Sequence, residues 1–357
     1  MRQSAALFAV LWALSSGAMA ADSPSIEEQV AQGTDVGAAV QAVGADSLAK
    51  ATVSFADGVT GYPDLTYATL PGYRPLKLDL FVPAGADAHP LVIYVHGGGW
   101  MAGGPRRSAA YADWPKVLAA LAAKGYVVAS VGYRFSGEAP FPAAIQDVKA
   151  AIRWLRANAD TYRVDPARAA IWGQSAGGHL AALAGVSCHV KSLAPAGRVV
   201  PAQGNVETTA STAAGADEAS DCVQAVVAWF GIYDFTKLAP QPAAVESAGD
   251  AAAQFLGCGT QPCAESRQRA ASPVTYVDRS DPPFLLIHGT DDQTVPMAQT
   301  ELFEVALKKA GVAVTKIVVP GVGHSWIGKT PDSTRQASLE ALRVSIDFID
   351  RAIGKPR

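Results

Sequence analysis

Short apolar runs alternate with helical patterns along this chain from about residue 75 onward. Such runs, bounded by Gly, Pro or polar residues, are typical of buried parallel strands that helices cover on both faces. Apolar residues at helical spacing lie between and after them, as over residues 145–155 and 339–349. The alternation predicts an α/β fold with a mostly parallel central sheet. The predicted strands are residues 76–82, 91–95, 126–131, 169–172, 225–230, 284–288 and 314–319.

The first twenty residues have the pattern of a cleaved export signal. Arg2 supplies a positive charge, residues 5–14 are apolar, and residues 18–20 form a small-residue cleavage site. The apolar run is far shorter than the ~20 residues that span a bilayer. The sequence therefore predicts a signal peptide over residues 1–20, an N-terminal extension over 21–50 and a folded domain over 51–357. It predicts a secreted or periplasmic protein without a membrane span.

Composition excludes two classes of protein. With 49% hydrophobic and 17% charged residues, the chain does not have the polar, highly charged composition of a disordered protein. Its 29 basic residues are balanced by 32 acidic ones, which gives a formal charge of −3 among 357 residues. Because phosphate binding needs clustered Lys and Arg, nucleic acid is not an expected partner.

Four cysteines in an exported chain indicate two disulfides. Cys258 and Cys263 are close in sequence, with turn-forming Gly and Pro residues between and beside them, so we expect these two to pair. Cys188 is then left to pair with Cys222. A zinc site is the competing interpretation, but the spacing contains no C-x-x-C pair, and no metal is expected.

Residues 189–221 interrupt the alternating pattern. They are rich in Ala, Gly, Ser and Thr and show no period. A long irregular segment inside a compact domain is uncommon unless it is functional or mobile. We expect an irregular insertion over the sheet edge, which either rims the functional site or is a plain surface loop.

The most specific motif is Gly173-Gln174-Ser175-Ala176-Gly177, which directly follows a predicted strand and opens a helical run. The pentapeptide alone is weak evidence, but the strand–turn–helix context is that of a nucleophile elbow. In such a turn, small neighbours let the Ser hydroxyl stand clear of the sheet. Ser175 is the predicted nucleophile.

A second glycine-rich motif, His96-Gly97-Gly98-Gly99-Trp100, follows the predicted strand 91–95. Successive glycines leave no Cβ in the way, so backbone N–H groups can point into a cavity. This is the form of an oxyanion-hole loop, in which a loop N–H acts together with the N–H of the residue after the nucleophile. Gly98, Gly99 and Ala176 are the predicted donors.

A Ser hydroxyl needs a general base, and His324 is the histidine whose position suits that role. It lies in a glycine-rich loop after the last predicted strand, which gives the chain order Ser, acid, His. The acid must then lie between Ser175 and His324, on a loop after a strand. Asp291 and Asp292 both satisfy that condition, and Asp234 is a weaker candidate. The other histidines suit the role less well. His89 lies in no motif, His179 lies on the helix after Ser175 and faces away from its hydroxyl by spacing, and His189 neighbours Cys188 in the irregular segment. His96, in the glycine-rich loop, is interpreted as structural, and His288, at the end of a predicted strand, as a packing residue.

Four aromatic residues are nearest in sequence to these loops. We expect them either to line the substrate pocket or to pack in the core. They are Trp100, Tyr133, Phe135 and Trp326.

Together these segments resemble the secreted carboxylesterases of the α/β-hydrolase superfamily. The likeness is to the bacterial family that includes acetylxylan and feruloyl esterases, near the hormone-sensitive-lipase group. It covers roughly residues 60–350, including, besides the two motifs, residues 65–68, 76–80, 132–136, 141–144 and 147–156. The resemblance implies an α/β-hydrolase fold with about eight strands and helices on both faces. It also implies that Asp292, the second Asp of H-G-x-x-D-x-x-V-P, is the acid.

The resemblance further implies the activity. The chain would be a serine carboxylester hydrolase that cleaves short-acyl or aromatic-acyl esters, on small molecules or linked to plant polysaccharides, through an acyl-enzyme. No cofactor is expected, and the oligomeric state stays open. One alternative is a serine peptidase of the prolyl-oligopeptidase type, against which the H-G-G-G-W loop argues. The other is a catalytically dead hydrolase fold used for binding, against which the complete set Ser175, Asp292 and His324 argues.

Overall fold

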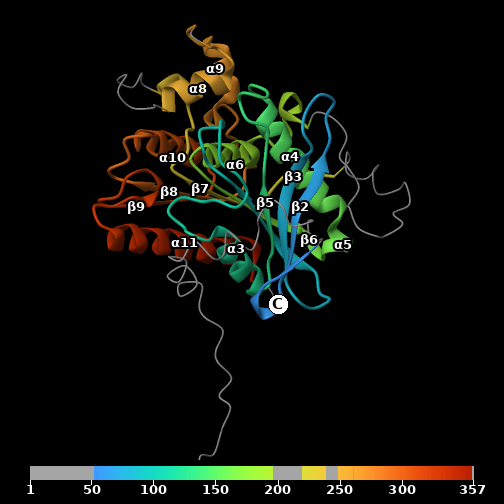
Figure 1. Cartoon of the computed structure of the whole chain (residues 1–357). Coiled ribbons are helices and arrows are strands. Elements are labelled where there is room, and N and C mark those ends of the chain that lie inside the picture. The colour runs from blue at the N-terminus through green and yellow to red at the C-terminus, as the bar shows by residue number, and fades with distance from the viewer. Residues whose placement is uncertain (1–51, 196–218, 239–247, 260, 356–357) are drawn as a thin grey trace, which may run out of the picture.

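The computed structural model describes residues 52–195, 219–238, 248–259 and 261–355 (Figure 1). The predicted signal peptide (1–20), the N-terminal extension (21–50) and residues 196–218 of the predicted insertion lie outside the described residues.

Nine strands in the described part of the chain form one sheet, in the order β1-β2-β3-β5-β4-β6-β7-β8-β9. Strands β4 to β9 pair in parallel, whereas β1–β2, β2–β3 and β3–β5 are antiparallel pairs. The mostly parallel sheet predicted from the sequence is confirmed. The strands are β1 (Val53–Ser54), β2 (Thr60–Ala68), β3 (Leu76–Val82), β4 (His89–Val95), β5 (Val127–Val131), β6 (Val164–Gln174), β7 (Ala225–Trp229), β8 (Phe284–Gly289) and β9 (Val314–Val319).

The sheet has one strand more than the approximately eight expected, and β1 and β2 were not among the apolar runs. β1 has only two residues, which is too short for a hydrophobic pattern. β2 contains Gly61, Pro63 and Asp64, and its pairing with β3 shifts register between Tyr62 and Leu65. Such irregularity is typical of strands near a sheet edge, where the apolar alternation is weak.

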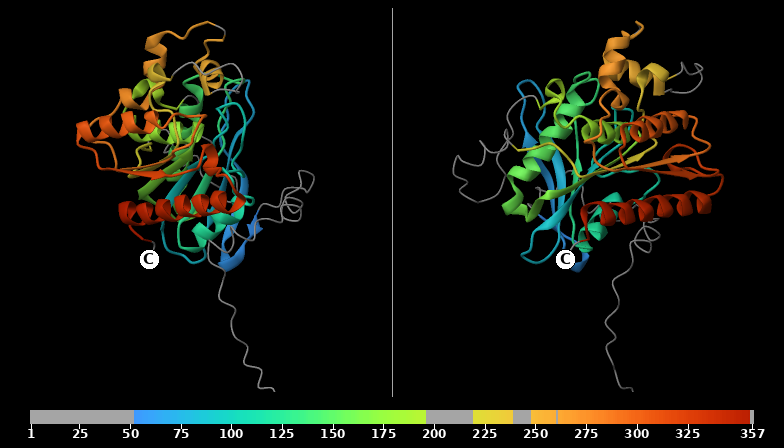
Figure 2. Two further views of the ribbon diagram at one scale, coloured as in Figure 1. Left: turned by 90° about the vertical axis from the view of Figure 1, so that its left-hand side faces the viewer. Right: turned by 180° about the vertical axis from the view of Figure 1, so that it is seen from behind.

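Helices cover both faces of the sheet (Figures 1 and 2). One face carries α4 (Ala143–Ala157), α6 (Ala176–Val186) and α10 (Ala298–Ala310), and the other carries α3 (Trp114–Ala123) and α11 (Pro331–Ile353). The shorter helices α8 (Ala248–Leu256) and α9 (Glu265–Ala271) lie on the α6 and α10 side, at the top of Figure 1. The helix α5 (Ala159–Tyr162) precedes β6.

The central strands are buried on both faces. In β4, Leu91, Ile93 and Val95 belong to the core beneath α4 and α6, while Val92 and Tyr94 belong to the core beneath α3 and α11, and all five are fully buried. Because successive strand residues point to opposite faces, a strand with two buried faces is apolar throughout. This explains why the sequence shows continuous runs rather than alternation.

The strand order places a crevice at the carboxyl end of β4. The chain passes from β4 to β5 on one side, and β6 then pairs with β4 on the other side. Such a reversal of direction opens a crevice beyond the carboxyl ends of the two strands. Val95 of β4 lies beside Gly173 of β6, so the two glycine-rich motifs that follow these residues meet there.

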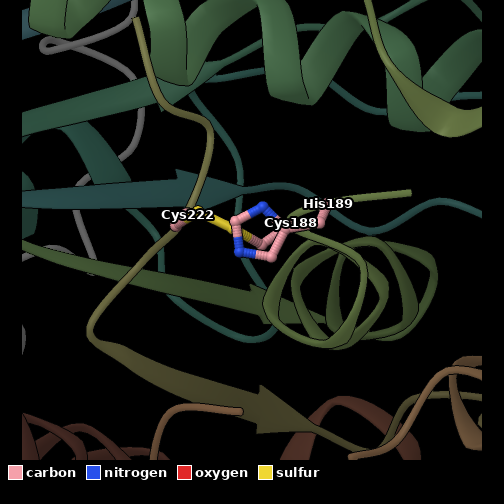
Figure 3. A group of neighbouring side chains, drawn as sticks. All are labelled: Cys188, His189 and Cys222. Atoms are coloured by element: carbon pink, nitrogen blue, oxygen red, sulfur yellow. A yellow bond between two sulfur atoms is a disulfide. The ribbon is translucent and has the colours of Figure 1, made fainter. Parts of the chain in front are cut away.

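Two disulfides are present, in the pairing predicted from the sequence. Cys188 is bonded to Cys222 with a Cα–Cα distance of 4.7 Å, and Cys258 to Cys263 with a distance of 5.2 Å. Figure 3 shows the first pair with the ring of His189 alongside. Possible ligand atoms of Cys188, His189 and Cys222 lie within 4.8 Å of one another. The disulfide, however, leaves neither sulfur available as a thiolate ligand.

No helix in the described ranges is both long enough and apolar enough to cross a lipid bilayer.

Candidate active site

Ser175 occupies a strained turn between β6 and α6. Its backbone adopts φ 52° and ψ −122°, which residues with a side chain rarely adopt. Glycine is needed on both sides of the turn. A Cβ at Gly173 would lie 2.1 Å from the carbonyl oxygen of Gly177, and a Cβ at Gly177 would lie 2.0 Å from the carbonyl oxygen of Val95. The strand–turn–helix context predicted for the G-x-S-x-G motif is therefore present.

Three side chains from separate loops form one chain of hydrogen bonds. His324, in the short turn that follows β9, places Nε2 2.9 Å from Oγ of Ser175. Its Nδ1 lies 2.8 Å from Oδ2 of Asp292, on the loop after β8. The Asp292 side chain is fully buried, whereas that of His324 is 19% exposed. A hydroxyl, an imidazole and a buried carboxylate in this order are what nucleophilic catalysis by serine requires.

Hydrogen bonds keep Asp292 ionised. Its Oδ1 accepts from the backbone N–H groups of Thr294 and Val295, each at 2.9 Å. Burial by itself raises the pKa of a carboxyl group, but hydrogen bonds from His288 and His324 outweigh burial and hold the pKa of Asp292 well below its ordinary value. The carboxylate therefore carries its charge throughout the neutral range, as a partner for an imidazolium ion must.

The other two acid candidates do not contact His324 in this structure. Asp291 is exposed and accepts a hydrogen bond from its neighbour Thr290 at 2.7 Å. Asp234 caps a short turn, where its Oδ1 accepts from the N–H of Thr236 at 2.9 Å. Of the two adjacent carboxylates after β8, the one that reaches the imidazole is the second.

Two buried histidines beside the site have structural partners. His96 places Nδ1 2.7 Å from the carbonyl oxygen of Gly97. His179 accepts from Nε1 of Trp100 at 3.1 Å and places its own Nε2 2.8 Å from the carbonyl oxygen of Ala271. Burial lowers the pKa of His96 and of His179 to about 4. Both rings are therefore neutral at neutral pH.

The loop after β4 adopts a conformation that favours glycine. Gly98 has φ 115° and Gly99 has φ 60°, and a Cβ at Gly98 would lie 2.2 Å from the carbonyl oxygen of Ala102. The carbonyl oxygen of Gly98 is turned toward the N–H groups of Met101 and Ala102, each at 3.0 Å. Across the crevice, Ala176 is the first residue of α6, so its N–H has no acceptor within the helix.

A cavity of about 660 Å³ opens over Ser175 and His324. Among the described residues that line it, none carries a carboxylate, ammonium or guanidinium group, so the cavity suits an uncharged ligand. The lining residues come from the glycine loop, the elbow, α8 and the loops after β7, β8 and β9. They are Gly97, Gly98, Gly99, Trp100, Met101, Ala102, Gln174, Ser175, Ala176, Ile232, Ala251, Gln254, Thr294, Val295, His324 and Ser325.

Of the four aromatic candidates, only Trp100 lines this cavity. Tyr133 is fully buried and donates to the carbonyl oxygen of His96 at 3.0 Å. Trp326 is fully buried in the core beneath α11, and Phe135 packs against the rings of Tyr133 and His96. Of the two roles expected for Tyr133, Phe135 and Trp326, packing is the one that the structure shows, because their rings lie outside the lining of this cavity.

A model of the BD-FAE family matches residues 78–307, which is more than half of the chain. The chain belongs to the BD-FAE family. The BD-FAE match includes Ser175 and Asp292 and ends before His324.

Known proteins similar to this BD-FAE chain are named as esterases. Esterase LipQ of Mycobacterium tuberculosis is 33% identical over 275 residues, which cover 74% of this chain and 56% of LipQ. The chain spans about half the length of the curated relatives it matches. A truncated carbohydrate esterase from gut microbiota has 31% identity and a TM-score of 0.65, over 85% of this chain and 99% of that one. A bifunctional GH43-CE protein of Bacteroides eggerthii has 34% identity and a TM-score of 0.63, over 82% of this chain and 35% of that one.

Sequence reasoning about this BD-FAE chain missed the part of the cavity wall that α8 supplies. Ala251 and Gln254 project from α8 into the wall, and Phe255 of the same helix stacks on Trp100 with 4.4 Å between ring centroids. No motif marks this segment. The one available signal was its nearness to the Cys258–Cys263 pair, which anchors the chain directly after α8.

Proposed function

We propose that this protein is a serine carboxylester hydrolase in which Ser175 is the nucleophile, His324 the general base and Asp292 the acid that orients it. The observation that carries the proposal is the unbroken chain of hydrogen bonds from Asp292 through His324 to Oγ of Ser175, at the floor of an uncharged cavity. The esterase names of its relatives support the same activity.

The reaction proceeds through an acyl-enzyme. Oγ of Ser175 attacks the ester carbonyl carbon while Nε2 of His324 takes the hydroxyl proton. The carbon–oxygen bond to the alcohol breaks, and the same proton passes from Nε2 to the leaving oxygen. Water then attacks the acyl group, giving its proton to Nε2 and later, through it, to Oγ of Ser175 as the carboxylic acid leaves. Asp292 holds the imidazole in the required tautomer and stabilises its positive form.

The negative charge on the carbonyl oxygen is stabilised by backbone N–H groups of Gly98, Gly99 and Ala176. Support comes from the positive φ angles of the two glycines and from the position of Ala176 at the N-terminus of α6. The N-terminal end of a helix favours negative charge through the aligned peptide dipoles.

The substrates are uncharged short-acyl or aromatic-acyl esters, either small or linked to polysaccharide. The cavity supports this assignment, because it holds about 660 Å³ and its described lining is neutral apart from the titratable His324. The similarity to a carbohydrate esterase, at 31% identity, supports a hydroxylated alcohol portion. Trp100 is the aromatic residue that contacts the substrate.

The protein acts outside the cytoplasm. Residues 1–20 are the signal peptide and residues 51–357 form the catalytic domain, with residues 21–50 as an extension and 189–221 as an insertion. The two disulfides support this location, because such bonds persist in oxidising compartments.

Covalent labelling tests the proposal directly. A fluorophosphonate probe should label the purified protein at Ser175 and should not label Ser175→Ala. The labelled protein should lose all activity on a panel of acetyl, butyryl, octanoyl and feruloyl esters and acetylated xylan. Ester hydrolysis that survives complete labelling, or labelling at another serine, would refute the assignment. Ranking the panel by kcat/KM then identifies the acyl group and the alcohol.

A further inference from the structure

His288 is a second histidine in contact with the acid of the candidate active site. It lies in β8, four residues before Asp292, and is fully buried. Its Nε2 lies 2.9 Å from the carbonyl oxygen of Val295 and 3.3 Å from Oδ2 of Asp292. Its Nδ1 lies 2.7 Å from Oγ1 of Thr300, in the first turn of α10. The ring thus connects the acid loop to a helix of the fold.

These partners determine which nitrogen of His288 carries the proton. A backbone carbonyl oxygen and an ionised carboxylate oxygen can only accept hydrogen bonds. Both face Nε2, so Nε2 bears the proton and donates to them. In the neutral ring Nδ1 then has a lone pair, and the hydroxyl of Thr300 donates to it. Tyr233, whose hydroxyl also hydrogen-bonds to Thr300, is the next titratable group beyond that contact.

The hydrogen bonds hold both oxygens of the carboxylate. Oδ1 is held by the N–H groups of Thr294 and Val295, and Oδ2 faces both His288 and His324. Rotation of the carboxylate would break hydrogen bonds on both oxygens. Oδ2 therefore stays aligned with Nδ1 of His324. Val295, which lines the cavity, is fixed at two points, because its N–H donates to Asp292 and its carbonyl oxygen accepts from His288.

We propose that His288 is a positioning residue that orients the carboxylate of Asp292 toward His324, and that Thr300 supports the Nε2-protonated tautomer of His288 by donating to Nδ1. The inference deepens the proposed function and rests on it. The titratable groups that face His288 are Asp292 directly, His324 beyond it and Tyr233 through Thr300. A packing role explains why His288 is buried, but not why its donor nitrogen is shared between the acid and the acid loop.

Two substitutions of His288 separate positioning from packing. Leu fills the space without a donor, whereas the amide N–H of Gln can reach the position of Nε2. A matched control is His89→Leu, because His89 is another buried histidine whose Nδ1 bonds to a backbone oxygen, that of Gly125 at 2.9 Å. It lies at the start of β4, at the opposite end from the site. The measurements are kcat and KM on one chromogenic ester, the pH profile of kcat/KM, and the low-field proton NMR signal of Nδ1–H in His324.

His288→Leu should lower kcat about ten- to hundredfold, the range for one hydrogen bond to a charged group, and change KM less than about threefold. The acid limb of the pH profile should move to higher pH, because Oδ2 loses a competing donor and attracts the His324 proton more strongly. The NMR signal should shift or broaden.

His288→Gln should recover most of kcat. Thr300→Val, which does not touch Asp292, should change all three readouts in the same direction but less, and Thr300→Ser should not.

Equal losses of kcat in His288→Leu and His89→Leu, with the wild-type pH profile and NMR signal in both, would overturn the inference. If His288→Leu does not fold, Thr300→Val decides: wild-type kcat, pH profile and NMR signal in that variant also overturn it. A wild-type protein that hydrolyses no ester would refute the proposed function instead. The NMR signal of His324 would then still report whether His288→Gln and Thr300→Val alter its contact with Asp292.

Discussion

Nε2 of His324 lies 2.9 Å from Oγ of Ser175, although 149 residues separate the two in the chain. The distance is short because β6 and β9 belong to the parallel part of one sheet, so the loops after them emerge at the same edge. A proton can pass between these two atoms without movement of either loop.

Ser175→Ala should abolish ester hydrolysis while the fold is retained. The hydroxyl is hydrogen-bonded to His324 at a half-buried position, so its loss removes chemistry rather than packing. His324→Ala should reduce kcat by a factor on the order of 10⁴ or more. Steady-state kinetics and thermal melting check both variants. A Ser175→Ala protein with a tenth of wild-type activity would rule out Ser175 as the nucleophile.

Asp292→Asn should be far more damaging than Asp291→Asn. The amide favours the wrong tautomer of His324, a change that costs about 10⁴ in a serine protease, and we expect a loss of at least about 100-fold here. Asp291 is exposed and its carboxylate accepts a hydrogen bond from the neighbouring Thr290, so its substitution should change kcat less than about tenfold. Measuring kcat of the two variants side by side decides between them. Greater damage in Asp291→Asn would reverse the assignment.

Gly98→Ala should disable the loop after β4. Its Cβ would lie 2.2 Å from the carbonyl oxygen of Ala102 at a φ of 115°, so the loop must move, and its N–H groups with it. Loss of one oxyanion donor lowers kcat about 10²- to 10³-fold. The control is Gly104→Ala, where an added Cβ meets no atom within 4 Å. Comparable kcat values for the two variants would remove this loop from the mechanism.

Stability should fall as the pH drops from about 6.5 to about 4. Burial lowers the pKa of His96 and of His179 from 6.5 to about 4, so over this window the unfolded chain binds protons that the folded chain does not. Over this window each of the two residues lowers the free energy of unfolding by about 1.4 kcal/mol for every pH unit of acidification. Above pH 6.5 both rings are neutral in the folded and in the unfolded chain, so neither adds to the pH dependence of stability. Urea unfolding at several pH values measures the slope. His179→Gln should make it shallower, and an equal slope in that variant would contradict the assignment.

The two disulfides should differ in what their removal changes. Cys188 and Cys222 are 34 residues apart and Cys258 and Cys263 are 5 apart, so chain entropy assigns about 4 and about 2 kcal/mol to them. To test which disulfide contributes more stability, both cysteines of one pair are replaced by Ser, and the free energy of unfolding is measured for each of the two double variants. The shorter loop follows α8, so its loss should also raise KM through the wall that Gln254 helps to form. A larger rise in KM for the Cys188/Cys222 variant would contradict this.

The residues of the elbow and of the glycine loop were predictable because their conformations depend on local properties. Gly173 must lack a Cβ for β6 to approach α6, Gly177 must lack one for α6 to approach the end of β4, and Gly98 must adopt a positive φ. These requirements leave a readable pattern of small residues in a short segment. The strands β4, β5, β7 and β8 were predictable for a similar reason, since burial on both faces makes each one a continuous apolar run, whereas β9, at the edge of the sheet, is only partly buried.

Contacts between side chains that are distant in the sequence depend on the tertiary structure. By position alone, Asp291 and Asp292 are equivalent candidates, and the resemblance of the motif favours Asp292. It is the packing of the loops after β8 and β9 that brings this carboxylate to His324. Gln254 reaches the cavity because α8 crosses over it, and Tyr133 and Trp326 face the core rather than the cavity. The amino-acid sequence specifies which side chains are available and which turns the backbone can make. Which of these side chains reach the active site depends on the order of the strands in the described sheet, because that order sets which loops become neighbours.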